Sequence, residues 1–282
     1  TTGASNTAIG QDSLGANTTG ATNTALGRNA LLANTTAANN TAVGYAAGAA
    51  VTTGTQNTLI GGLAGDALTD ADDNVAIGYA ALTRDTLGSN TVAIGKGVLA
   101  NQNFTSATDT YNTAVGHLAG AEVTTGVQNT LMGGLAGDAL TTGGNNVAVG
   151  HNALTTETGA SASVAIGKEA LRDQNVSSGS SYNVAVGFEA GKLVSTGIQN
   201  VIIGGLAGDA LTDSDYNTVV GYQALSSDTL GGRSTAIGYQ TLATQNFTSA
   251  TNAYNTAVGY SAGIAVTTGI ENVLIGGLAG DA

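Results

Sequence analysis

The chain has 282 residues, with 43 Gly, no Pro, no Cys and no Trp, and only 9% of its residues are charged. The absence of cysteine excludes disulfides, thiolate metal sites and cysteine nucleophiles. A formal net charge of −12 disfavours nucleic acid and anionic membrane surfaces as partners, because both are bound through basic patches. No apolar run approaches the ~20 residues that span a bilayer, so we expect no membrane insertion by this segment.

A short motif, N-T-A-(I/V)-G or a close variant, recurs along the whole chain from Asn6–Gly10 onward. Its glycine, here named the motif glycine, recurs every 17 residues, except for spacings of 21, 20 and 21 after Gly95, Gly167 and Gly238. Such fixed-period self-similarity is typical of stacked repeats. Since the sequence starts and stops inside the pattern, we interpret residues 1–282 as one repeat domain from a longer fibre protein. The motif glycines are Gly10, Gly27, Gly44, Gly61, Gly78, Gly95, Gly116, Gly133, Gly150, Gly167, Gly187, Gly204, Gly221, Gly238, Gly259 and Gly276.

The three residues before each motif glycine predict a short strand, beginning with residues 7–9, 24–26 and 41–43. They combine Thr or Val, a mostly Ala position, and an aliphatic residue, a period-2 pattern that favours β-structure. A 17-residue unit cannot bury its own apolar face, so the units must stack. The sequence therefore predicts an all-β parallel solenoid, or β-roll, of sixteen coils. Helical repeats are disfavoured because they usually need ~33–47 residues each.

Two further ladders accompany the strands. Asn stands four places before the motif glycine in thirteen coils, with Thr91, Ser163 and Ser234 in the others, and stacked Asn side chains can hydrogen-bond along such a ladder. Four places after the motif glycine the residues run Leu, Leu, Gly, Gly and then repeat, as in Leu14, Leu31, Gly48 and Gly65. Duplication of a four-coil block is the simplest origin of this longer period.

The alternation gives each strand two faces. We expect the Thr/Val and Ile/Val positions to face the core, so that Asp in place of Ile60 or Val149 should unfold neighbouring coils. The Ala face, which includes Leu59 and Leu131, is not polar as a solvated strand face should be, and we expect a partner chain to cover it. The alternative is a thin monomeric solenoid whose other sheet covers this face.

Acidic turns and two histidines are the only candidates for metal or acid–base chemistry. Carboxylate-rich turns suit calcium, but the equivalent turn after Asp138 reads T-T-G-G, so we favour solvated turns. His117 and His151 stand one place after a motif glycine, where Tyr recurs, and we interpret them as members of a surface ladder. We expect no catalytic residue, no cofactor and no metal site. The acidic turns contain Asp66, Asp70, Asp72 and Asp73, and Asp209, Asp213 and Asp215.

Three insertions interrupt the period, at about residues 101–111, 174–182 and 245–254. Three or four extra residues cannot join a regular coil, so we expect them to bulge outward as loops, where recognition tends to reside. The alternative is that they only shield neighbouring chains. The candidate receptor contacts are the aromatic residues Phe104, Tyr111, Tyr182, Phe247 and Tyr254.

The motifs at Asn6–Gly10, Asn40–Gly44 and Ser163–Gly167 resemble the head repeats of YadA-type trimeric autotransporter adhesins. The longer pattern G-Y-x-A-L…T-x-G-x-x-N-T-A-V-G also resembles repeats in bacteriophage tail fibres. The resemblance covers the whole chain and implies a left-handed parallel β-roll with three chains per fibre. The 17-residue coil is slightly longer than in typical adhesin heads.

From these features we expect a non-catalytic structural or adhesive shaft of a homotrimeric extracellular fibre, on a virion tail or a bacterial cell surface. It would attach to a host-surface glycan or protein. One alternative is a glycan-degrading solenoid enzyme of the tail-spike kind, which would need paired carboxylates ~5–9.5 Å apart in a groove. The other is an ice-binding solenoid, which is disfavoured while the Thr ladder is assigned to the core.

Overall fold

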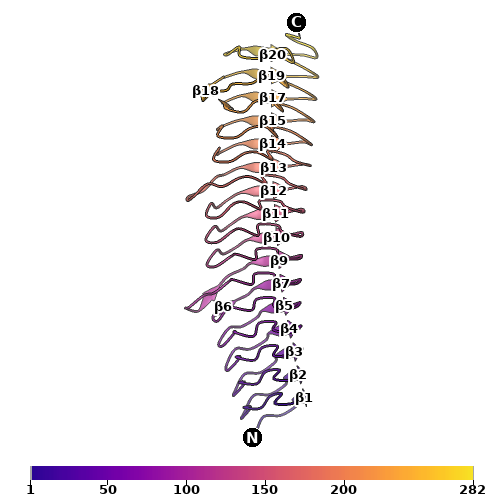
Figure 1. The fold of residues 1–282 in the computed structure, drawn as a ribbon, viewed down its shortest axis with the longest axis vertical. Helices are drawn as coiled ribbons and strands as arrows, with labels where there is room; N and C mark the ends of the chain where they lie inside the picture. The colour runs from indigo at the N-terminus through magenta and orange to yellow at the C-terminus, as the bar shows by residue number, and fades with distance from the viewer. Residues whose placement is uncertain (1, 282) are drawn as a thin grey trace. The chain divides into compact units, whose positions relative to one another are not determined.

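The computed structural model describes residues 2–281, and this part of the chain contains strands and turns but no α-helix. Accordingly, none of the described residues belongs to a helix that could cross a membrane. The chain divides into two compact units, Thr1–Thr142 and Gly143–Ala282. In each unit narrow coils of about 17 residues stack one on the next (Figure 1). The predicted all-β parallel solenoid of sixteen coils is confirmed.

The first unit contains one strand of the main sheet in each of eight coils. Neighbouring strands pair in parallel, and each residue lies opposite its equivalent in the next coil, as Thr7 does opposite Thr24. The strands are β1 (Thr7–Ile9), β2 (Thr24–Leu26), β3 (Thr41–Val43), β4 (Thr58–Ile60), β5 (Val75–Ile77), β7 (Val92–Ile94), β9 (Thr113–Val115) and β10 (Thr130–Met132). An additional pair, β6 (Gly88–Ser89) and β8 (Thr108–Asp109), lies at the first insertion.

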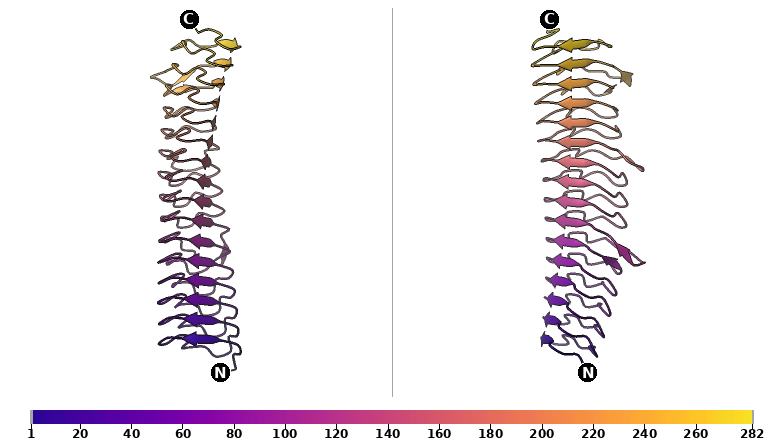
Figure 2. Two further views of the ribbon diagram at one scale, coloured as in Figure 1. Left: turned by 90° about the vertical axis from the view of Figure 1, so that its right-hand side faces the viewer. Right: turned by 180° about the vertical axis from the view of Figure 1, so that it is seen from behind.

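The second unit has the same organisation and also contains eight coils. Its main strands are β11 (Val147–Val149), β12 (Val164–Ile166), β13 (Val184–Val186), β14 (Val201–Ile203), β15 (Thr218–Val220), β17 (Thr235–Ile237), β19 (Thr256–Val258) and β20 (Val273–Ile275). Strands β16 (Gly231–Gly232) and β18 (Thr251–Asn252) pair at the third insertion. Within each unit the main strands line up along one side, and the additional strands lie away from them (Figure 2).

The two strand faces are oriented opposite to the prediction. The middle residue of each main strand from β2 to β19, such as Ala42 or Leu59, is fully buried in the coil interior, whereas the Thr/Val and Ile/Val positions on either side are half-buried or exposed. In the terminal strands β1 and β20 the middle residue is exposed or half-buried, because no further coil covers it. Ile60 and Val149, which were expected in the core, lie on the outer face. The coil is narrow, so its interior takes Ala beside the main strand in most coils, and a larger residue such as Leu59 or Leu131 only in some of them. The Ala face is covered by turns of the chain's own coil, such as those at Gly48 and Gly65, and not by a partner chain or by the second sheet that the alternative expected.

The Leu-Leu-Gly-Gly pattern compensates for the size of the buried strand residue. A Cβ added to Gly48 would lie 2.6 Å from Leu59 Cδ1, and one added to Gly65 would lie 2.8 Å from Leu59 Cδ2. Leu59 therefore occupies the space that Leu31 or Leu82 fills in neighbouring coils. Because interiors are packed to near-crystalline density, a large residue at one position requires glycine at the other. This complementarity gives the four-coil period a packing reason.

The predicted Asn ladder is confirmed, and it also connects each Asn to backbone groups. The side-chain oxygen of Asn40 accepts a hydrogen bond from the backbone N–H of Asn57 at 2.8 Å. Its Nδ2 donates to the carbonyl oxygen of Gly54 at 2.8 Å. Asn40 is fully buried, so these bonds satisfy groups that would be costly to leave unpaired.

The motif glycine is required by the close approach of successive coils. Gly116 has φ = +139°, and a Cβ placed on it would lie 2.4 Å from the carbonyl oxygen of Gly133 in the next coil. No side chain fits that distance, and the backbone conformation itself favours glycine.

Candidate interaction surfaces

The outer face of the main sheet is a continuous strip of uncharged side chains, with a row of Thr and Val beside a row of aliphatic residues. It consists of the residues three places and one place before each motif glycine, which contain Thr, Val, Ile, Leu or Met and no charged residue. Several of its members are substantially exposed, including Leu26, Met132, Ile166 and Ile203. With strands ~4.8 Å apart, eight coils extend this strip over roughly 34 Å in each unit. An exposed aliphatic row of this extent marks an interaction surface.

A second ladder runs along the residues one place after the motif glycines. His117 and His151 are exposed there, as predicted for surface ladder members, together with exposed Tyr residues. Tyr222, Tyr239 and Tyr260 stack in sequence, with ring centroids 5.8 and 5.2 Å apart. Ring faces held parallel at this spacing stabilise neighbouring coils and present aromatic edges to solvent.

A cluster of ion pairs in the second unit contains three of the chain's seven basic residues. The Glu169 carboxylate lies 2.9 Å from Lys192 Nζ, 3.1 Å from Lys168 Nζ and 3.2 Å from Arg172 Nη1. Hydrogen bonds from Lys192 and then Lys168 lower the pKa of Glu169 from its ordinary 4.5 to about 2. The negative charge of Glu169 is therefore favoured in the folded state.

This lowered pKa predicts a pH dependence for the contribution of Glu169 to stability. Because the folded pKa lies below the unfolded one, the contribution is present above about pH 4.5 and is lost as the pH falls toward 2. Glu169→Gln should lower the unfolding free energy at pH 7 by about 1 kcal/mol or less, since solvent screens such pairs. Thermal melts of both proteins should converge near pH 2. A difference that persists there would contradict the prediction.

The insertions are anchored by a buried carboxylate, which the sequence analysis missed. Asp85 is fully buried, and its carboxylate accepts hydrogen bonds from Gln102 Nε2 at 2.6 Å and from the backbone N–H groups of Gly88 and Phe104 at 3.1 Å. Gln102 Oε1 in turn accepts a hydrogen bond from Asn112 Nδ2 at 2.9 Å. Three uncharged donors therefore satisfy this buried carboxylate. Without such hydrogen bonds its burial would be costly.

The same anchor occurs at the other two insertions. Glu157 accepts from Gln174, and Asp228 accepts from Gln245, and all four side chains are fully buried. In each case the carboxylate lies seven places after a motif glycine and the Gln follows 17 residues later. The first four-coil block, which has no insertion, has Asn17 and Asn34 in these places. An acid followed by Gln at this position was the sequence signal for an insertion.

The anchor also explains the three exceptions in the Asn ladder. Gln102 donates to Thr91, Gln174 to Ser163 and Gln245 to Ser234, over 3.2, 2.8 and 3.2 Å. These hydroxyl residues are the ones that replace Asn four places before a motif glycine. A short hydroxyl side chain leaves room for the amide of the incoming Gln and accepts its hydrogen bond.

The insertions are more ordered than the simple loops that were predicted. Strand β8 pairs with β6, strand β18 pairs with β16, and an isolated parallel bridge joins Ser161 to Ser180 at the second insertion. Phe104 and Phe247 are each only 7% exposed, so the expectation that they present exposed aromatic rings is wrong. Both rings are buried within their insertions, because removing an apolar side chain from water is favourable.

The three tyrosines remain candidates for receptor contact. Tyr111, Tyr182 and Tyr254 are 56%, 57% and 52% exposed, and each has a left-handed backbone φ of 50° or 51°. Each directly precedes a buried Asn of the ladder, so the insertion ends in a turn that directs the ring outward.

The acidic turns bind to the preceding coil. Asp72 Oδ1 accepts hydrogen bonds from the backbone N–H and the hydroxyl of Thr55, and Asp70 Oδ1 accepts from Thr53 Oγ1. Among residues 2–281 no three His, Cys, Asp or Glu side chains are grouped closely enough to hold a metal ion.

Comparisons of this chain with protein-family models, with curated proteins and with solved structures gave no match.

Proposed function

We propose that this protein is a non-catalytic structural and adhesive segment of a homotrimeric extracellular fibre. The observation that carries the proposal is the uncharged outer strip of the main sheet, described above. A second copy of the chain has the same strip with the same strand spacing, so two such surfaces match along their whole length. The chain has a net charge of −12, and association through a strip without charges avoids juxtaposing like charges.

The three-chain state, the left-handed winding and the location on a virion tail or bacterial surface come from the resemblance of the repeats to adhesin heads and tail fibres. They are part of the proposal. The surface through which the chains associate differs from the one expected from the sequence, because the Ala face is inside the coil. A stacked solenoid transmits its shape from coil to coil, which suits a shaft that holds recognition sites away from its base.

The arrangement of the three buried carboxylates and of the two imidazoles supports a non-catalytic role. Asp85, Glu157 and Asp228 are fully buried and occupied by hydrogen-bond donors, so they cannot reach a substrate. His117 and His151 are exposed members of the surface ladder and lie two coils apart, too far to act on the same atom. General acid–base catalysis requires a titrating group within hydrogen-bond reach of the reacting atoms.

Sedimentation equilibrium of the chain should give three times the 27.4 kDa of one copy. Val149→Lys combined with Val186→Lys should reduce the mass to one copy and leave the far-ultraviolet circular dichroism unchanged, because both residues lie half-buried on the outer strip. Tyr79→Lys is the matched control, since Lys96 already occupies the same position in the next coil. A wild-type monomer that melts cooperatively would refute the trimer.

A second candidate function is ice binding, which the observed strand orientation favours. Thr7, Thr24, Thr41 and Thr58 lie on the outer side of the strand in four successive coils, at a regular spacing of ~4.8 Å. The reason for disfavouring this function, that the Thr side chains are in the core, was therefore wrong. The second unit is less suited, because β11 to β14 carry Val in the same position. Thermal hysteresis from a monomeric wild-type chain would favour ice binding over the fibre.

A further inference from the structure

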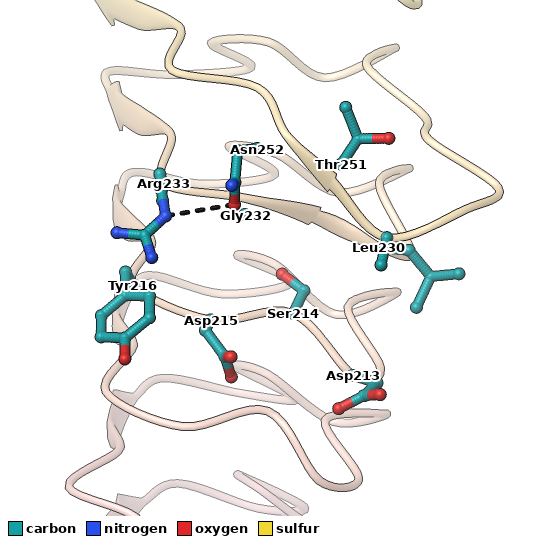
Figure 3. Close-up of a pocket in the computed structure, with 10 residues that line it drawn as sticks. Asp213, Ser214, Asp215, Tyr216, Leu230, Gly232, Arg233, Thr251 and Asn252 are labelled. Carbon is teal, nitrogen blue, oxygen red and sulfur yellow. Dashed lines mark hydrogen bonds between the residues drawn. The ribbon is translucent and has the colours of Figure 1, made fainter.

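A polar pocket lies beside the third insertion, in the second unit. It has a volume of about 220 Å³ and is formed by the turn at Asp213–Tyr216, by residues 230–233 at strand β16 and by residues 250–252 at strand β18. The side chains of Asp213, Asp215, Tyr216 and Arg233 line it (Figure 3). Pockets for drug-sized ligands measure ~300–1,000 Å³, so this one suits a smaller group such as a single sugar ring.

Arg233 is held in place while its terminal nitrogens remain available. Its Nε donates to Asn252 Oδ1 at 3.1 Å, and its guanidinium carbon lies 4.5 Å from the ring centroid of Tyr216 and 6.0 Å from that of Tyr254. Among the described residues, Nη1 and Nη2 have no hydrogen-bond acceptor. A guanidinium fixed by aromatic faces and one hydrogen bond loses little freedom when it binds a ligand.

Each of the two pocket carboxylates is held through one of its oxygens, Oδ1. Asp215 Oδ1 accepts a hydrogen bond from the backbone N–H of Ile198 at 2.7 Å, and Asp213 Oδ1 accepts from Thr196 Oγ1 at 2.6 Å. Each carboxylate leaves its Oδ2 without a protein donor among residues 2–281. The pocket therefore offers strong acceptors from the two carboxylates and strong donors from Arg233.

These groups select a neutral, polyhydroxylated ligand. An anionic ligand would face two carboxylates and only one guanidinium, and the net charge of −12 adds to the repulsion. Neighbouring sugar hydroxyls can donate to Asp213 and Asp215 and accept from Arg233. We propose that the pocket binds one neutral hexose unit of a surface glycan. This inference rests on the proposed adhesive function and names its ligand class.

The first insertion does not have the side chains that form this pocket. At the equivalent positions it has Asp73 in place of Tyr216, Asn90 in place of Arg233 and Asp109 in place of Asn252. Asn90 Nδ2 donates to Asp109 Oδ1 at 2.9 Å, which corresponds to the bond from Arg233 to Asn252. The hydrogen bond between these two positions is thus retained, but the cation and the aromatic ring are absent from them. The first insertion therefore lacks the guanidinium and the ring that would hold a sugar beside its acidic turn.

The test is saturation-transfer nuclear magnetic resonance with methyl glycosides of glucose, galactose, mannose and N-acetylglucosamine, and with methyl glucuronide as the anionic probe. At least one neutral glycoside should bind, and the glucuronide should bind more weakly. Arg233→Asn and Asp215→Asn should each reduce affinity at least tenfold. Arg233→Asn should fold, because Asn90 adopts the same left-handed conformation, with φ of 59° against 62°. The matched control Arg28→Asn removes another Arg that lies over a Tyr, at 5.9 Å, and should leave binding unchanged.

The possible outcomes separate this inference from the proposed function. Absence of binding to all four neutral glycosides, unchanged binding in Arg233→Asn, or strongest binding of the glucuronide would each overturn the hexose pocket. The mass of the same samples tests the fibre independently, because a trimer that binds no sugar refutes the pocket alone. Release of reducing ends from a bound oligosaccharide would refute both the non-catalytic function and a purely binding role for Asp213 and Asp215.

Discussion

Leu59→Asp is expected to unfold the coils around it. Leu59 is fully buried, and its two methyl groups fill the spaces beside Gly48 and Gly65. Truncating a buried Leu costs ~2–5 kcal/mol, and an unpaired carboxylate in the same interior adds a further penalty. Since a domain is stable by only ~5–15 kcal/mol, the midpoint of chemical denaturation followed by circular dichroism should fall sharply.

Ile60→Asp is the matched control, because Ile60 is the next residue and lies on the outer face. It should leave the coil folded and should weaken the association of chains, which sedimentation equilibrium measures separately. Equal losses of unfolding free energy in the two variants would show that the strand does not have one interior face and one exterior face.

Asp85→Ala is expected to loosen the first insertion and to destabilise the first unit. The substitution leaves the buried donors of Gln102, Gly88 and Phe104 without their acceptor. Each orphaned buried donor costs ~1–3 kcal/mol. Gln102 Nε2 keeps Thr91 as an acceptor, so the two backbone N–H groups set the total loss at roughly 2–6 kcal/mol, less where water enters to replace the carboxylate. Limited proteolysis should then cut within residues 101–111 much faster than in the wild type.

Asp109→Ala is the control for that experiment, since Asp109 belongs to the same insertion but is exposed. The hydrogen bond that Asp109 accepts from Asn90 is exposed to solvent. Loss of this bond should change the unfolding free energy by about 0.5 kcal/mol or less. If Asp85→Ala behaved like Asp109→Ala, the buried carboxylate would not be the anchor of the insertion.

The sequence by itself determined the period, the strand positions and the places of the insertions. These follow from local requirements that repeat in every coil. Gly116 and its equivalents are needed wherever two backbones approach closely, and Asn40 and its equivalents wherever a buried carbonyl needs a donor. Such requirements act within one coil and its neighbours, so they leave a periodic trace that can be read without coordinates.

Only the tertiary structure decided which side of each strand faces inward. In a three-residue strand such as Thr58-Leu59-Ile60 both faces carry apolar residues, and alternation alone does not distinguish them. The width of the coil makes the choice, because it admits Ala, or a Leu compensated by glycine, and excludes a continuous ladder of Ile and Val. The same holds for Phe104 and Asp85, whose burial depends on how the insertion folds back over the preceding coil. The pocket at Arg233 likewise depends on three segments that meet only when the coils stack.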